Sequence, residues 1–310
     1  QGGSPFNVPV IWYGRPLGSA FPSPSSPKAI SQYHFSNSLM FDLSEGLNFE
    51  VSLTASEHEN KHTRPDTVES RFEQALLGQG GPDGNEQWNI FLPLENSPRL
   101  INYIKGSETS IKTGSLISLD GVFTGRKNGI DFAMGFQFNS EDLEINYSEG
   151  SRATFDSDGK LLKGADLLFL GGGKNVNTSR DKQAIFFETN TNFIEKLDLI
   201  LSGRYEKLEN ESSFDPKFSF RYLASDRLLL RGSIGTSFTT PSMAQMFSSE
   251  IQLGSVRDIN NSPFVRLALL GNSNLKPATS ENINLGFIWN ISDAIDLTLD
   301  YWTINYKNRI

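Results

Sequence analysis

The sequence predicts an all-β fold, namely part of a transmembrane antiparallel β-barrel with about ten strands. Apolar and polar residues alternate with a period of two along most of the chain, which is typical of strands with one apolar and one polar face. The connections between these strands are mostly short at one end and long at the other, as in transmembrane barrels. Aromatic residues lie near predicted strand ends, where such barrels carry interfacial girdles; they are Tyr205, Tyr222, Trp289, Tyr301 and Trp302.

The alternation places the strands at about 30–41, 47–57, 111–124, 130–139, 182–192, 196–206, 214–223, 228–236, 279–289 and 295–307. Short connections, most of them with turn-type residues, lie at 42–46, 125–129, 192–196, 224–227 and 290–294. The connections at 58–110, 140–181 and 237–278 are long, whereas the one at 207–213 is short. A helix is predicted in the first long connection, with Asp66 as its N-cap and Gly78 at its end. Phe72, Ala75 and Leu76 would share its apolar face.

Composition excludes several classes of protein. The 310 residues carry a net charge of −8, which argues against a nucleic-acid-binding protein because such proteins usually need a basic face. The chain has no cysteine, which excludes disulfides, cysteine zinc sites and cysteine nucleophiles. No apolar run approaches the roughly 18 residues of a membrane helix. A soluble β-sandwich could also use two-faced strands and stays an alternative, although loops of about 40 residues are unusual in a compact soluble domain.

Three motifs invite a functional interpretation that their context does not support. The run from His58 to His62 spells H-E-x-x-H, but it follows a predicted strand, so we expect a chance match in a polar loop. Gly171, Gly172 and Gly173 lack the spacing of a phosphate-binding loop and are expected to form a flexible loop. The run 156–159 resembles part of a calcium loop but is expected to be a turn. The sequence therefore predicts no catalytic or metal site, no cofactor and no enzymatic activity.

Several segments carry a family resemblance. Residues 230–242 (LRGSIGTSFTTPS), 272–282 (NSNLKPATSEN) and 299–304 (LDYWTI), together with 204–206 and 214–217, resemble segments of TonB-dependent outer-membrane receptors. The likeness is strong over 181–310 and weaker before it. Thr239 and Ala278 depart from the family pattern, which usually has Arg and Glu there.

The resemblance implies a barrel of about 22 strands around a separate plug, with periplasmic turns and extracellular loops. Residues 1–310 would form part of one such barrel domain, and the plug and the C-terminal strands would lie outside this chain. The chain ends within a predicted strand, which fits a fragment of a longer protein. The implied function is TonB-energised uptake of an iron chelate, cobalamin or a glycan across the bacterial outer membrane. Its partners would be TonB, outer-membrane lipid and the extracellular ligand; a passive porin or a barrel adhesin is the alternative.

Two sets of residues are candidates for the site. The loop-side set, expected to contact the ligand, comprises Arg15, Phe238, Thr239, Pro241 and Ser242. The second set consists of charges on the predicted polar faces: Asp198, Arg204, Glu206, Lys217, Arg221 and Arg231. We expect these lumen-facing charges to hydrate the wall and to dock the plug, because opposite charges on neighbouring strands pair. Contact with the substrate at the loop-side rim is the alternative role.

Overall fold

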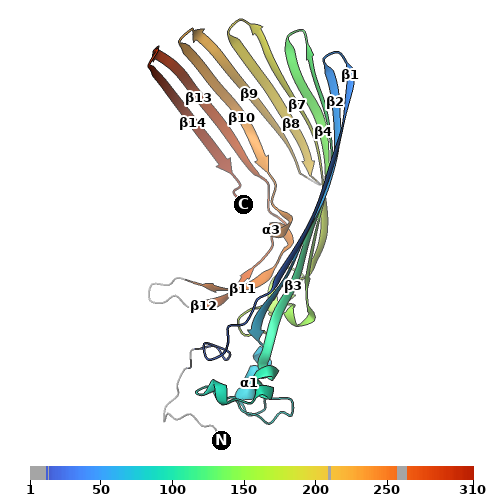
Figure 1. The fold of residues 1–310 in the computed structure, drawn as a ribbon, viewed down its shortest axis with the longest axis vertical. Helices are drawn as coiled ribbons and strands as arrows, with labels where there is room; N and C mark the ends of the chain where they lie inside the picture. Colours follow the sequence, from blue (N-terminus) through green and yellow to red (C-terminus); the bar gives the residue numbers. More distant parts are fainter. Residues whose placement is uncertain (1–11, 13, 209–210, 257–263) are drawn as a thin grey trace.

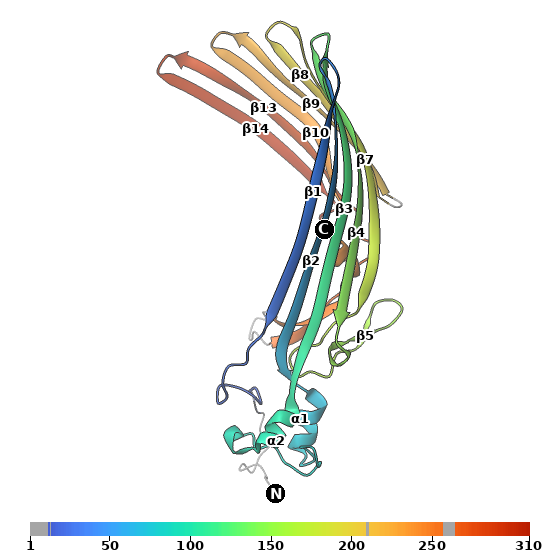
Figure 2. The ribbon, with the colours of Figure 1, turned by 45° about the vertical axis from the view of Figure 1, so that its right-hand side comes forward.

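A computed structural model describes residues 12, 14–208, 211–256 and 264–310. Ten strands form one curved antiparallel sheet in the order β1-β2-β3-β4-β7-β8-β9-β10-β13-β14 (Figures 1 and 2). They are β1 (Lys28–Ser44), β2 (Leu47–Thr67), β3 (Lys105–Lys127), β4 (Ile130–Tyr147), β7 (Val176–Ile194), β8 (Leu197–Leu208), β9 (Glu211–Ser225), β10 (Leu228–Thr239), β13 (Ala278–Ser292) and β14 (Ile295–Lys307). This sheet confirms the predicted fold class, a partial antiparallel barrel wall.

Short turns join successive strands at one end of the sheet, called here the turn end. The β3–β4 turn consists of Asn128 and Gly129, both in the left-handed region at φ 54° and 79°. Two consecutive residues with positive φ match the right-handed twist of the paired strands, and Asn-Gly is a common sequence for such a turn. The opposite end, the loop end, carries the long connections and all the small elements. These are α1 (Glu69–Leu76), α2 (Pro98–Ile104), α3 (Met243–Phe247), the 3-10 turns η1 (Pro93–Glu95) and η2 (Glu149–Ser151), and the small sheets β5 (Thr154–Phe155) with β6 (Leu161–Lys163) and β11 (Glu250–Ser255) with β12 (Phe264–Leu269).

The strand register gives the large sheet two chemically different faces. On the outer, convex face Val51 pairs with Gly121, which in turn pairs with Phe136. The next row, Ser52, Asp120 and Gln137, points to the concave face, where Gln137 donates a hydrogen bond of 2.5 Å to Asp120. From residue 49 to residue 55 of β2 the apolar rows extend over about 20 Å, close to the height of the lipid-facing band of a membrane barrel.

The strands continue further toward the loop end than their alternation predicts. β2 reaches Thr67, so the H-E-x-x-H run lies in a strand rather than in a loop. His58 and His62 therefore point to one face and Glu59 to the other, which removes the helical geometry of a zinc protease.

The prediction that five aromatic residues form interfacial girdles is also wrong in part, because Trp302 lies on the concave face, two residues from Asp300.

The predicted helix exists, but it begins differently. α1 starts after Val68 without a side-chain cap, and the Asp66 carboxylate instead accepts hydrogen bonds from the backbone N–H groups of Thr67, Phe169 and Leu170. Phe72 and Ala75 are buried as predicted, whereas Leu76 is 39% exposed. No helix of the described residues is long and apolar enough to cross a membrane.

A second helix, α2, completes a small core with α1 at the loop end. Ser97 caps α2 by accepting a hydrogen bond of 3.0 Å from the Leu100 N–H. The buried cluster consists of Phe72, Ala75, Trp88, Leu100 and Ile104. This unit has its own apolar contacts and projects beyond the large sheet (Figure 2).

We predict that Leu100→Ala destabilises this unit selectively. Leu100 is 1% exposed, and truncating a buried leucine typically costs about 2–5 kcal/mol because it leaves a cavity. Limited proteolysis of the full-length protein, read by mass spectrometry, should show faster cleavage within 69–104 and unchanged cleavage elsewhere. Leu77→Ala is the matched control because Leu77 is 74% exposed. Equal cleavage rates in the two variants would contradict the assignment of this core.

Candidate functional site

The connection between β10 and β13 folds back onto the concave face of the sheet. We call its described residues, 240–256 and 264–277, the inner strap. Figure 1 shows α3 and the β11–β12 hairpin of this strap on the concave side, opposite β3 and β4. Charged side chains and backbone groups of the wall hold the strap at several points. The strap therefore brings residues near the end of β10 against strands that lie far from them in the sheet order.

The first contact of the strap is made by Arg180 of β7. Its side chain is 7% exposed and donates a hydrogen bond of 2.7 Å to the carbonyl oxygen of Pro241. The same guanidinium donates to Glu141 at 2.6 and 3.2 Å, and Lys182 binds the other oxygen of that carboxylate. Charge-assisted bonds of this kind are short and strong, so Arg180 fixes the start of the strap on the wall.

The second contact is made by Glu250 of β11. Its carboxylate accepts hydrogen bonds from the Lys112 ammonium at 2.8 Å and from the Tyr147 hydroxyl at 3.1 Å. Burial alone would raise the pKa of Glu250, but the hydrogen bond and charge of Lys112, with further bonds from Gln252 and Tyr147, outweigh it. The pKa of Glu250 therefore lies below its usual value, and the carboxylate is held in its charged form.

The third contact uses the glycines at 171–173, which are buried and not a flexible loop as predicted. The Gly172 N–H donates to Glu108 at 3.0 Å, and its carbonyl accepts a hydrogen bond of 2.8 Å from the Ile251 N–H. A Cβ atom at Gly171 would overlap the Ile251 side chain, so a glycine is required for this close approach.

The prediction of a turn at 156–159 is confirmed, because the Asp156 carboxylate accepts hydrogen bonds from the N–H groups of Asp158 and Lys160.

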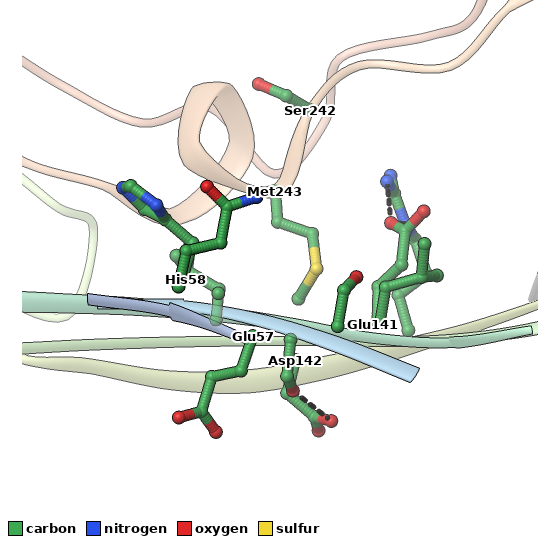
Figure 3. Close-up of a pocket in the computed structure, with 13 residues that line it drawn as sticks. Glu57, His58, Glu141, Asp142, Ser242 and Met243 are labelled. Atoms are coloured by element: carbon green, nitrogen blue, oxygen red, sulfur yellow. Dashed lines mark hydrogen bonds and ion pairs between the residues drawn. The ribbon is translucent and has the colours of Figure 1, made fainter. Parts of the chain in front are cut away.

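A cavity of about 420 Å³ lies between α3 and the sheet (Figure 3). Met243 extends from α3 toward the sheet and is 7% exposed, while His58 reaches into the same space from β2. Glu57 and Asp142 point away, to the opposite face of the sheet. Because both carboxylate oxygens of Glu141 are already engaged, the cavity offers mainly neutral hydrogen-bonding groups and a thioether. Besides the engaged ion pair, the cavity presents the His58 imidazole, several serine hydroxyls and the Met243 thioether to a ligand.

The loop-side candidates of the sequence fall into two places. Phe238 and Thr239 end β10, the backbone of buried Pro241 binds Arg180, and Ser242 forms a capping box with Gln245 at the start of α3. Only Ser242 of these lines the cavity under α3. Arg15 lies apart from them, with its guanidinium 4.8 Å from the centre of the Phe169 ring. A ligand role for these five residues stays a prediction.

The structure places the predicted lumen charges on the concave face. Asp198 pairs with Arg221 at 3.2 Å, Arg204 with Glu206 at 2.8 Å, and Arg231 with Asp300 at 2.7 Å. Lys217 lies on the same face, opposite Ser202. Docking of a plug or contact with a substrate by these charges stays a prediction.

Sequence reasoning missed charges that hold the inner strap or its partner Arg180. Arg180, Glu141 and Glu250 lie within or beside stretches predicted as long connections, where no alternation marks a face. The only available signal was the pair Arg180 and Lys182, charges two residues apart next to a predicted strand. Their partners are far away in sequence, so the pattern could not show what they bind.

Comparisons with known proteins show the family and the fold of the chain. The chain matches the family model described as "TonB dependent receptor-like, beta-barrel" over residues 3–310. It is 24% identical over 140 residues to the "Probable TonB-dependent siderophore receptor PirA" of Acinetobacter baumannii, a match that covers 45% of this chain and 18% of that protein. The solved copper transporter OprC aligns with a TM-score of 0.52 and 11% identity over 89% of this chain and 38% of its own. Pseudomonas aeruginosa FpvA bound to a heterologous pyoverdine with iron gives a TM-score of 0.50 and 14% identity over 89% of this chain and 33% of its own. The chain thus spans less than half the length of each relative.

We predict that docking of the inner strap weakens in acid. A carboxyl with a lowered folded-state pKa contributes stability above its usual value of 4.5, and this contribution is lost as the pH falls through the lowered value. Hydrogen–deuterium exchange of the Ile251 amide, corrected for the intrinsic rate, should show constant protection near neutral pH and falling protection below about pH 4.5.

Glu250→Gln should lower the protection of this amide at pH 7 and leave a smaller fall on acidification, because Gln carries no charge to lose. Glu149→Gln, at an exposed carboxyl of η2, is the matched control. The same acid fall in wild type and Glu250→Gln would show that Glu250 does not hold the strap.

Proposed function

Since the chain belongs to the TonB-dependent receptor β-barrel family, we propose that it forms part of the wall of an outer-membrane receptor for TonB-energised uptake of a scarce nutrient. The observation that carries this proposal is the sheet itself, apolar on its convex face and polar on its concave face, with the inner strap folded over the concave side. The convex face would meet outer-membrane lipid. The concave face would line the lumen, and a plug outside this chain would connect it to TonB.

An iron chelate is the ligand class that we propose first. The curated relative PirA is named a siderophore receptor, and FpvA was solved with a pyoverdine and iron. At the loop end, Arg15 and Phe169 line one cavity, and a cation beside an aromatic ring suits a chelate of this kind. Cobalamin and glycans remain the classes against which the chelate is tested.

Uptake by the full-length protein tests this proposal. A strain that lacks the gene should lose uptake of an iron-55-loaded siderophore, and the full-length gene should restore it. Removing TonB from the restored strain should abolish the uptake, because the plug is moved by energy that TonB delivers. Uptake that persists without TonB would indicate a passive pore. Normal uptake of iron by the deletion strain, with loss of cobalamin or glycan uptake, would overturn the ligand class.

We predict that a charge on the convex face blocks membrane insertion. Val51→Arg places a cation among the apolar rows, where an arginine costs about 2–4 kcal/mol at the bilayer midplane. Ser52→Arg is the matched control, because the adjacent side chain points to the polar concave face. Outer-membrane fractionation of the full-length protein, with heat-modifiable gel mobility, should show less folded Val51→Arg and normal Ser52→Arg. The reverse result would mean that the two faces are assigned the wrong way round.

A further inference from the structure

A second cavity lies at the loop end, away from the cavity under α3. It has a volume of about 620 Å³ and is enclosed by the segment before β1, the ends of β2 and β3, residues 169–170 and β11. Figures 1 and 2 both show the segment before β1 close to the β11–β12 hairpin at this end. Cavities of about 300–1,000 Å³ suit small-molecule ligands. Five separate stretches of the chain therefore meet around a space of ligand size.

The walls of this cavity are mainly apolar. Leu17 and Phe21 come from the segment before β1, Phe169 and Leu170 from the β4–β7 connection, and Leu253 from β11. Leu253 belongs to the inner strap, three residues after Glu250, so the cavity is complete only while the strap is docked. The lining thus favours a ligand with an apolar or aromatic body.

The charges of the cavity are not balanced. The Arg64 guanidinium is neutralised by the buried Glu108, and the Asp66 carboxylate accepts three backbone hydrogen bonds. Lys105 donates to the neutral amide oxygen of Asn102. Arg15 lies over the Phe169 ring and, among the described residues, has no carboxylate partner. Two cations at the rim, Arg15 and Lys105, are therefore available to an anion.

We propose that this cavity binds an aromatic anion, a molecule with a flat apolar body and an acidic group of the carboxylate or sulfonate type. The body lies against Phe169 and Leu253, and the acidic group meets the Arg15 guanidinium. A guanidinium stacked on an aromatic ring is held in a fixed orientation with its donors free, which favours a charge-assisted hydrogen bond to an anion. This inference deepens the proposed receptor function, because it names the chemistry of one part of the ligand. The biological role of the site rests on that proposed function.

Binding of two matched dyes tests the proposal directly. 8-Anilinonaphthalene-1-sulfonate carries a sulfonate, whereas N-phenyl-1-naphthylamine has the same aromatic body without the charge. Both are titrated by fluorescence into the full-length protein in lipid nanodiscs, with empty nanodiscs subtracted. Arg15→Gln should weaken the sulfonate dye roughly tenfold, which is the usual effect of losing one charge-assisted hydrogen bond, and should leave the neutral dye unchanged.

Three further variants make the result decisive. Arg15→Lys should keep most of the affinity for the sulfonate dye, and Phe169→Leu should weaken both dyes. Arg227→Gln, an exposed arginine at the turn end, is the control and should change neither. If Arg15→Gln behaves like Arg227→Gln, or if it weakens both dyes equally, the anion site is overturned. Uptake of iron-55 is measured separately, so failure of the dye test and failure of the proposed function are distinguishable.

Discussion

The hydrogen-bond ladder of the ten-stranded sheet is the constraint on which everything else depends. Lipid offers no hydrogen bonds, so a chain that crosses it must pair its backbone groups strand to strand. Because side chains alternate along a strand, a slip of one residue would exchange the two faces. The register shifts beside four turns at the turn end but holds along the rest of these paired strands, and it even aligns distant charges. Arg231 of β10 reaches Asp300 of β14 across Gly286 of β13, where any side chain would occupy the space of the ion pair.

At the loop end the balance of forces changes. Here the strands extend beyond the apolar rows, and charged and backbone hydrogen bonds hold the inner strap together with its buried side chains Met243 and Ile251. Arg180, Glu141 and Lys182 form one ion cluster, while Glu250 with Lys112 forms another.

The sequence predicts the wall better than the site for a physical reason. The alternation of apolar and polar residues is a pattern among residues close together in the sequence. The ten strands could therefore be predicted wherever one face of a strand is apolar. Around Glu57, His58 and Glu59 both faces are polar, and the alternation disappears although the ladder continues. Arg180 binding the carbonyl of Pro241, 61 residues away, has no local pattern at all. The same holds for the buried glycines at 171–173, whose small size matters only because the strap packs on them.

The strap and the Arg15 cavity are coupled by their position in the chain. Glu250 holds the strap on Lys112, and Leu253 of the same short strand closes one wall of the cavity. Undocking of the whole strap would therefore also remove Leu253 from the cavity. Ligand binding and strap docking are thermodynamically linked. If a ligand binds only the closed cavity, docking of the strap strengthens its binding, and the bound ligand stabilises the docked strap by the same free energy. A ligand that binds the Arg15 cavity would thus affect the concave face, where α3 covers the other cavity.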